Sequence, residues 1–194
     1  MKNKTLFMVE VAVFAALALL LDWVSGVVFS RIWPQGGSVS IAMVPVFLMA
    51  YRWGLKGGLL TGFLLGMLQM VLTYAQVVHP AQGFLEYFLA FTLVGAAGLF
   101  TNSVNGNLEV GKRTKAYTYA VLGIFIGSFL RFLCHFAAGI IFWGSYAPEG
   151  QPVALYSLIY NGTYMLASFI LSAIVVVMLY SAAAKVLLRK SYQS

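Results

Sequence analysis

Long apolar runs separated by short polar breaks follow one another along the whole chain. A helix can cross the hydrocarbon core of a membrane when about 20 consecutive residues are predominantly apolar, or a few more when it is tilted. Six runs fit this pattern and predict six transmembrane helices. The predicted helices cover residues 6–29, 39–53, 57–76, 84–101, 116–143 and 153–184. The second run is the shortest, so we expect that helix to begin or end inside the protein rather than in lipid.

The breaks between these runs contain glycine or proline, the residues that most favour turns. They lie at residues 33–37, 53–58, 79–80, 102–115 and 146–150. Of the 194 residues, 61% are hydrophobic and 9% are charged, which is too few charges to cover the surface of a soluble protein. The predicted fold class is therefore an all-α membrane protein, a bundle of six transmembrane helices that forms a single domain over residues 1–194.

Lysine and arginine indicate the orientation, because short cytoplasmic loops of membrane proteins are enriched in both. If the N-terminus is cytoplasmic, Arg31 is the sole basic residue in an outer loop, and Arg131 falls within the fifth helix. The inner segments hold Lys2, Lys4, Arg52, Lys56, Lys112, Arg113, Lys115, Lys185, Arg189 and Lys190. We therefore expect both termini in the cytoplasm. This topology explains the net charge of +7, so the charge does not indicate a nucleic-acid partner.

Unusual polar and aromatic residues gather at the outer ends of the predicted helices. Glu86 is the most informative, because a charge at the centre of a bilayer costs about 2.5–3.5 kcal/mol and usually has a polar partner or a function. The candidate site residues are Trp33, Tyr74, Glu86, Tyr87, His135, Gly139, Trp143, Tyr156 and Asn161. His135, Gly139 and Trp143 are spaced four apart and so share one helix face. Gly139 is expected to leave room for a flat ring.

Simpler explanations exist for each of these residues alone. An interfacial belt accounts for a single tryptophan or tyrosine, a core position for His135, and a helix N-terminus for Glu86. None of them explains an acid, an imidazole and a carboxamide at one depth, so we predict a pocket open to the outside. Glu86 and the aromatic faces favour a cation, while Asn161 and His135 offer donors and acceptors. The predicted ligand is a small, flat, cationic or amino-substituted heteroaromatic.

Motifs for catalysis or metal binding are missing from the sequence. The segment 106–113 approaches a phosphate-binding loop, but Arg113 stands where serine or threonine would bind magnesium. Cys134 is the single cysteine, which excludes an internal disulfide and a thiolate metal cluster. We therefore predict no catalytic residues, no metal site, no cofactor and no enzymatic activity. Of the two acids in the first helix, Asp22 is expected to cap or pair locally and Glu10 to pair with an N-terminal lysine.

The chain resembles the thiamine-specific substrate-binding subunits (S components) of energy-coupling factor (ECF) vitamin transporters over nearly its whole length. The markers are residues 10–18, 36–45 and 85–87, and the spaced set His135, Gly139, Trp143, Tyr156 and Asn161. The resemblance implies a six-helix protein of a prokaryotic plasma membrane that binds thiamine near its outer surface, with the nine candidate residues at the site. It places Trp33 in a lid and supports Tyr74 less well than the others.

The resemblance also implies partners. Such subunits associate with a transmembrane coupling protein and two ATPases, which use the ATP. The small residues Ala12 and Ala16 match the docking surface of the family, although spacing alone is equally typical of packing inside the bundle. By resemblance, Trp143 and His135 are assigned to ring stacking, Glu86 to the charge or amino group of the ligand, and Asn161 to the pyrimidine edge.

Three alternatives remain at the level of the sequence. The first is an S component for another small heteroaromatic vitamin or precursor, such as hydroxymethylpyrimidine. The second is a multi-pass membrane enzyme that uses Glu86 and His135 as acid and base. The third is a secondary carrier that transports without ATP or a partner. The role of Arg131, which could bind helix-end carbonyls or balance Glu86, stays open.

Overall fold

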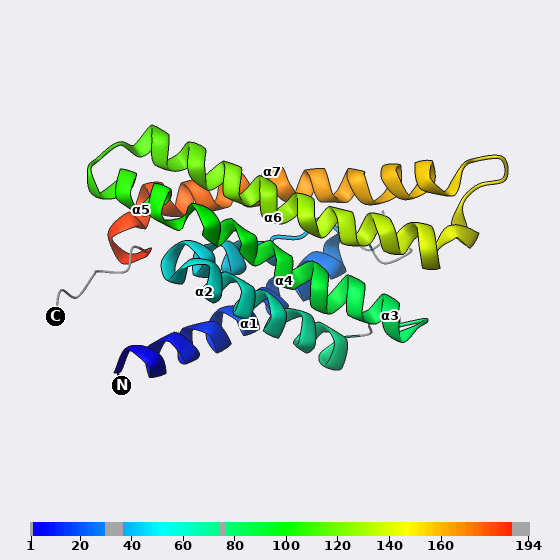
Figure 1. The fold of residues 1–194 in the computed structure, drawn as a ribbon, viewed down its shortest axis with the longest axis horizontal. Coiled ribbons are helices and arrows are strands. Elements are labelled where there is room, and N and C mark those ends of the chain that lie inside the picture. Colours follow the sequence, from blue (N-terminus) through cyan, green and yellow to red (C-terminus); the bar gives the residue numbers. More distant parts are fainter. Residues whose placement is uncertain (1, 30–36, 74–76, 188–194) are drawn as a thin grey trace.

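The computed structural model describes residues 2–29, 37–73 and 77–187, and the regular structure in these ranges is helical throughout (Figure 1). Five helical stretches of this part of the chain are long and apolar enough to cross a membrane. They are α1 (Lys2–Phe29), α2 (Met43–Leu72), the continuous run from Pro80 to Glu109, α6 (Arg113–Phe142) and α7 (Val153–Leu187). The prediction of an all-helical membrane protein is thus confirmed.

Helix α2 is broken at Gly54, inside the break predicted at 53–58. Gly54 has φ 74° and ψ −167°, a conformation that glycine adopts without the penalty of a side chain. Residues eight apart lie about 12 Å from each other in a continuous helix. A Cβ placed on Gly58, however, would lie 2.7 Å from the Cβ of Ala50. The chain therefore turns back at Gly54, and the parts of α2 before and after it pack side by side.

The run from Pro80 to Glu109 combines several kinds of helix. It comprises α3 (Pro80–Gly83), the π-helical η1 (Phe84–Leu89), α4 (Ala90–Val94), the 3₁₀-helical η2 (Gly95–Phe100) and α5 (Thr101–Glu109). It begins at His79, whose Nδ1 accepts a hydrogen bond from the Ala81 amide at 3.1 Å, and Pro80 supplies the favoured first residue.

The predicted polar break over 102–115 contains a turn but was too long, because the helix continues to Glu109 and only three residues separate it from α6. The polar side chains have partners inside the protein. Thr101 Oγ1 donates to the Ala50 carbonyl at 2.8 Å, and Asn105 Nδ2 donates to the Tyr51 carbonyl at 2.8 Å. These carbonyls belong to the last turn before Gly54 and would otherwise lack helical donors. The break in α2 therefore explains the polar sequence of α5.

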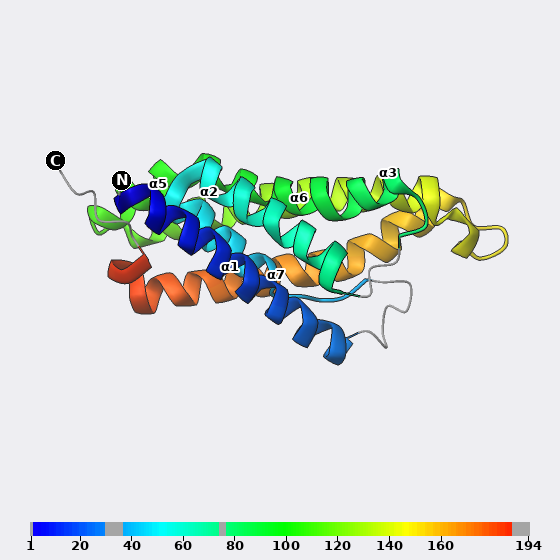
Figure 2. The same cartoon turned by 90° about the horizontal axis from the view of Figure 1, so that it is seen from below.

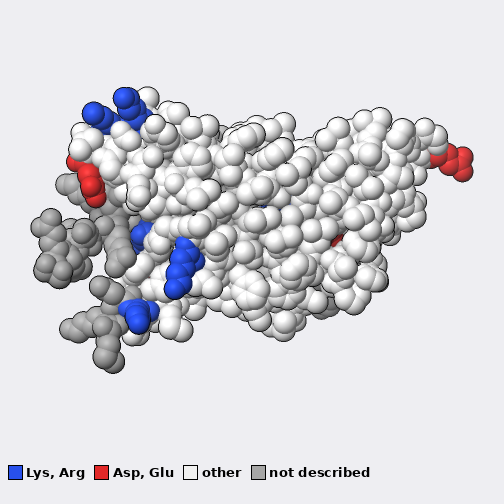
Figure 3. Space-filling view, viewed as in Figure 1, with Lys and Arg blue, Asp and Glu red and all other residues white. Residues whose placement is uncertain are grey.

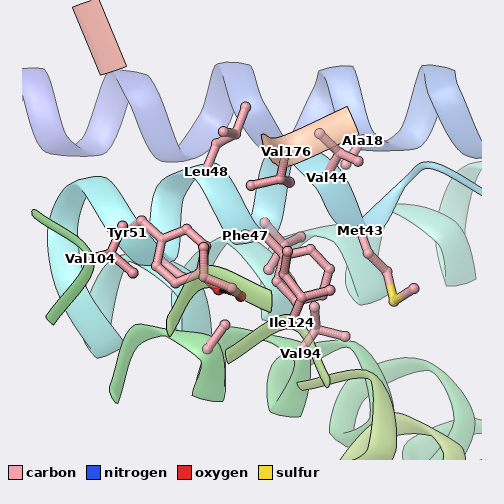
Figure 4. Close-up of a cluster of buried hydrophobic side chains, with 14 of the residues drawn as sticks. Ala18, Met43, Val44, Phe47, Leu48, Tyr51, Val94, Val104, Ile124 and Val176 are labelled. Carbon is pink, nitrogen blue, oxygen red and sulfur yellow. Dashed lines mark hydrogen bonds between the residues drawn. The ribbon is translucent and has the colours of Figure 1, made fainter. Parts of the chain in front are cut away.

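The core lies between α2, α4, α6 and α7 (Figure 4). Phe47, Ile124 and Val176 are fully buried there, and Tyr51 donates from its hydroxyl to the Ala120 carbonyl at 2.5 Å. The second part of α2 packs closely on the run 80–109, because a Cβ on Gly66 would collide with the Tyr87 carbonyl. This close approach positions η1, which carries Glu86.

The two acids of α1 form long-range contacts. Glu10 makes an ion pair with Arg52 at 2.7 Å and accepts a hydrogen bond from Trp53 Nε1 at 2.5 Å, two partners from α2 that the sequence analysis did not name. Asp22 accepts hydrogen bonds from Ser40 Oγ at 2.9 Å and Gln69 Nε2 at 2.5 Å. Glu10, through Arg52, and Asp22, through Gln69, thus fasten α1 to α2. The two helices lie beside each other in Figure 2.

The first turns of α1 and the last turns of α7 lie at the same end of the elongated molecule (Figures 1 and 2). The lysine and arginine side chains visible in Figure 3 gather at that end, whereas the middle of the molecule is almost free of visible charge. Lys4 lies near the start of α1, Lys56 follows the break in α2, and Lys115 lies in the first turn of α6. Charge is therefore segregated along the long axis of the bundle.

Candidate functional site

Glu86 lies in η1, where the helix widens into a π-helical turn. Such turns are rare and occur frequently at functional sites. The side chain of Glu86 is 14% exposed, so its carboxylate lies well inside the bundle. Because η1 packs against Gly66 of α2, the position of the acid is fixed by backbone contact.

Three donors from two segments converge on the Glu86 carboxylate. Gln82 Nε2 donates to Oε2, Trp143 Nε1 donates to the same oxygen at 3.3 Å, and His135 Nδ1 lies 3.5 Å from Oε1. Among the described residues, no lysine or arginine forms an ion pair with Glu86. The carboxylate is therefore held in place by an amide, an indole and an imidazole, and its charge is left available.

Gln82 is a member of this site that the sequence analysis missed. Its side chain is fully buried, and its Oε1 accepts a hydrogen bond from the Val78 amide at 3.2 Å. It therefore links the start of the run 80–109 to Glu86. The available signal was a glutamine four residues before a membrane acid, a spacing that places both side chains on one helix face.

Asn161 joins α7 to α6 behind His135. Its Nδ2 donates to the Ser157 carbonyl at 3.0 Å and the His135 carbonyl at 3.3 Å, and its Oδ1 accepts from Tyr164 Oη at 2.8 Å. Asn161 is 7% exposed. Both hydrogens of its amide group are engaged within the protein, which makes Asn161 a support for His135 as well as a candidate ligand contact.

The expectation that Gly139 leaves room for a ring was wrong. A Cβ at this position would lie 2.2 Å from Ser157 Oγ and 3.1 Å from Asn161 Nδ2, so α7 already fills that space. Gly139 instead allows α6 and α7 to approach closely, which is what small residues do between membrane helices. It contributes to the site by bringing Asn161 against His135.

A row of tyrosines on α7 leads from the site toward the segment before α2. Tyr156 and Tyr160 have ring centroids 5.7 Å apart, and Tyr160 lies 6.1 Å from Tyr164. Tyr164 meets the His135 ring edge-on at 6.4 Å. The hydroxyl of Tyr160 accepts a hydrogen bond from the Gly37 amide at 3.4 Å. The predicted residue Tyr156 is thus connected to His135 through two further aromatic rings.

The remaining predicted residues divide into two groups. Tyr87, next to Glu86, is partly buried and packs against the main core cluster. Trp33 and Tyr74 lie outside the described residues. Of the predicted residues that the structure describes, His135 and Trp143 contact Glu86 directly through their side chains.

Two buried groups near the acid are relevant to its chemistry. His135 Nε2 is buried and has no hydrogen-bond partner in the part of the chain that the structure describes, so it can donate to or accept from a ligand. Arg131, one turn before His135, places its guanidinium carbon 4.2 Å from the centre of the Phe91 ring. Arg131 thus makes a cation–π contact, and the described chain shows neither of the two partners considered for it.

The histidine, cysteine and acidic residues that the structure describes include no group of three that could hold a metal ion. What the described residues offer instead is a carboxylate that forms no ion pair with lysine or arginine, an indole, and an imidazole nitrogen. This combination suits a flat ligand that carries positive charge or amino groups.

The sequence profile of the family described as "Thiamine transporter protein (Thia_YuaJ)" matches residues 8–188. The chain belongs to the thiamine transporter family. It is 44% identical over 180 residues to the "Thiamine transporter ThiT" of Bacillus subtilis (strain 168), covering 93% of each chain. It is 37% identical over 191 residues to the protein of the same name from Lacticaseibacillus paracasei, covering 95% of this chain and 92% of the relative.

A solved structure of ThiT from Listeria monocytogenes matches the fold of this family member with a TM-score of 0.88 and 30% sequence identity. The match covers 96% of this chain and 100% of that one. The family resemblance predicted from the residues is therefore confirmed. As a member of the thiamine transporter family, the protein is a multi-pass membrane transporter and not an enzyme.

Proposed function

We propose that this member of the thiamine transporter family is a thiamine-binding S component and that it captures thiamine in the pocket around Glu86. The observation that carries this proposal is a buried carboxylate that accepts from Gln82 and Trp143 and lacks a lysine or arginine partner in the described chain. A buried carboxylate without a compensating cation favours a cationic ligand. Thiamine carries a positive thiazolium ring joined to an aminopyrimidine, so it supplies both a cation and an amino group.

Each predicted residue has a role in this proposal. Glu86 faces the charge or the amino group, and His135 and Trp143 contact and stack on the rings. Asn161 offers a second lone pair on Oδ1 to the pyrimidine edge, since Tyr164 occupies the first. Trp33, Tyr74, Tyr87 and Tyr156 are proposed as further lining of the pocket, whereas the role of Gly139 is to let α7 approach His135.

We further propose a single six-helix domain in the prokaryotic plasma membrane, with both termini in the cytoplasm. The reversal at Gly54 supports counting the two parts of α2 as separate membrane helices. The basic end of the molecule, where α1 begins and α7 ends, corresponds to the cytoplasmic side. Glu86 and Trp143 then face the outer half of the membrane.

For transport, we propose that the exposed face of α1 docks onto the transmembrane coupling protein of an ECF module with two ATPases. Ala12 and Ala16 are exposed, whereas Val11, Ala15 and Ala18 on the other face are buried. Internal packing therefore does not account for Ala12 and Ala16. Small side chains would allow a partner helix to approach closely, and reorientation of the loaded subunit driven by the ATPases would release thiamine inside.

Tryptophan fluorescence of the purified protein tests the binding proposal. Titration with thiamine should quench the emission saturably, because Trp143 borders the pocket, and Trp143→Phe should remove most of the quenching. Trp53→Phe is the matched control, since Trp53 lies at the basic end and contacts Glu10. Absence of a saturable signal from folded protein would refute the proposal. Stronger quenching by hydroxymethylpyrimidine than by thiamine would instead favour a transporter for that precursor.

A further inference from the structure

A surface groove lies between the first turns of α6 and the last turns of α7, far from Glu86 along the bundle. Its volume is about 470 Å³, and it is lined by Thr114, Tyr117, Thr118, Val121, Leu122 and Val177. The five α6 residues follow the spacing i, i+3, i+4, i+7, i+8, so they form one face of the helix. The site described above uses none of the groove residues. We call this feature the α6–α7 groove.

Basic side chains flank the end of the α6–α7 groove. Lys112, Arg113 and Lys115 are exposed, and none of them forms an ion pair with a described residue. Arg113 lies one turn before Tyr117, and Lys115 lies one turn before Thr118 and Tyr119. Helical spacing thus places Arg113 and Lys115 at the two edges of the α6 face that lines the groove, on either side of Thr114. An anionic group with an attached apolar chain would match this arrangement from end to end.

We propose that the α6–α7 groove binds an anionic phospholipid. One acyl chain lies along Tyr117, Val121 and Val177, and the phosphate is held between Arg113 and Lys115. Long basic side chains at the end of a membrane helix reach toward the headgroup region, and anionic headgroups attract basic residues at that depth. The proposal requires that α6 and α7 lie in the bilayer; it does not require that the ligand pocket binds thiamine.

A lipid fits this surface better than a partner protein does. The face proposed for docking is on α1, which packs against α2, whereas α6 packs against α7, α4 and α5. Helices α1 and α6 lie on opposite sides of the molecule in Figure 1. Docking through Ala12 and Ala16 would therefore leave the α6–α7 groove facing lipid, where an acyl chain is the apolar group at hand to occupy it.

Native mass spectrometry of the full-length protein in detergent tests the proposal. Phosphatidylglycerol and phosphatidylcholine with identical acyl chains are titrated separately, and bound lipid is counted. The wild type should prefer phosphatidylglycerol. Arg113→Gln with Lys115→Gln should lower that preference by about five-fold for each cation removed. Lys56→Gln is the matched control, because it removes an exposed cation at the same end of the molecule but beside the α2 break.

A second variant tests the apolar part of the site. Val121→Trp fills the α6–α7 groove and should reduce binding of both lipids.

Equal binding of the two lipids by the wild type would overturn the proposal. So would a loss of the preference for phosphatidylglycerol in Lys56→Gln as large as that in Arg113→Gln with Lys115→Gln. The proposal would also be overturned if glycerol phosphate bound as strongly as phosphatidylglycerol, because the site would then recognise the phosphate without the acyl chain. If Val121→Trp keeps lipid binding but blocks assembly with partner proteins, the groove is a protein docking site and the proposal is wrong. Thiamine titration of the same samples shows that the variants are folded and tests the pocket independently.

Discussion

At the scale of single residues, the site is built around one acid whose partners are all uncharged or only conditionally charged. Glu86 accepts from Gln82 and Trp143, and His135 lies within 3.5 Å. These groups position the carboxylate but do not compensate its charge fully. A cationic ligand would complete the balance, and this gives the acid its proposed role in selecting the ligand.

Replacement of Glu86 by glutamine should weaken thiamine binding by about 10- to 100-fold. Loss of a charged hydrogen-bonding partner in a buried site costs on the order of 1–3 kcal/mol, and each 1.4 kcal/mol corresponds to a factor of ten. Isothermal titration of the purified variant gives the affinity directly. Glu149→Gln, in the exposed turn before α7, is the matched control and should bind as the wild type does. Unchanged affinity in Glu86→Gln would mean that the ligand does not meet this acid.

Replacement of Asn161 by alanine should affect both binding and stability. The variant removes the hydrogen bond between Asn161 Oδ1 and the Tyr164 hydroxyl and the hydrogen bond from Asn161 Nδ2 to the His135 carbonyl. A hydrogen bond contributes about 0.5–1.5 kcal/mol to stability, so the thermal unfolding midpoint in detergent should fall even without thiamine. A variant with normal stability and weaker binding would show that Asn161 acts on the ligand alone.

The candidate site could be predicted from the sequence only as far as chemistry and helix faces reveal it. An acid in an apolar run identified Glu86, and a four-residue spacing placed His135 and Trp143 together. The sequence could not reveal which residues of another helix pack against a given helix face. Gly139 was therefore expected to leave room, although Ser157 fills it. Gln82 was missed because its four-residue spacing places it on the same helix face as Glu86 but does not by itself show that the two side chains bond.

At the scale of helices, close contacts between backbones determine where the site residues lie. Gly139 should tolerate no side chain, because a Cβ there lies 2.2 Å from Ser157 Oγ. Gly139→Ala is expected to destabilise the protein by about 1–3 kcal/mol through overpacking. Ser157→Ala removes the colliding oxygen, so adding it to Gly139→Ala should recover part of the loss. A double variant no better than Gly139→Ala in thermal unfolding would contradict this explanation.

The reversal in α2 depends on the backbone conformation of Gly54 rather than on close packing. Its positive φ disfavours any side chain, so Gly54→Ala should lower the free energy of unfolding by roughly 1–2 kcal/mol. Gly106→Ala is the matched control: a Cβ there meets nothing within 4 Å, and alanine favours the helix. Thermal unfolding of both variants in one detergent compares them. Equal stability of the two would show that the turn at Gly54 carries no backbone constraint.

The helices were largely predictable because apolar length and glycine placement are local properties. The predicted break at 53–58 contains Gly54, and α6 and α7 begin within a few residues of the predicted limits. The end of the fourth helix was not predictable. Residues 102–109 are polar enough to resemble a loop, but Asn105 pairs with a carbonyl of α2, a contact between elements far apart in the sequence. The π-helical turn at Glu86 has the same origin, since it packs against Gly66.

At the scale of the whole molecule, the proposed ligand pocket and the proposed docking surface lie on different helices. The pocket joins the run 80–109, α6 and α7, whereas Ala12 and Ala16 lie on the exposed face of α1. Contacts of Asp22 with Ser40 and of Glu10 with Arg52 hold α1 to the rest of the bundle. The two activities, binding and coupling, should therefore be separable by mutation.

Ala12→Trp with Ala16→Trp should abolish thiamine uptake by vesicles that contain the ECF partner proteins and ATP, while leaving thiamine affinity unchanged. Two indoles on the exposed face would prevent close approach of a partner helix but would not reach the pocket. Val24→Trp with Val28→Trp is the matched control, because these residues are also exposed on α1 and also four apart, but lie nearer its outer end. Uptake should persist in the control. Uptake by the first pair at the wild-type rate would exclude this face of α1 as the docking surface, and loss of thiamine affinity would show that α1 and the pocket are not independent.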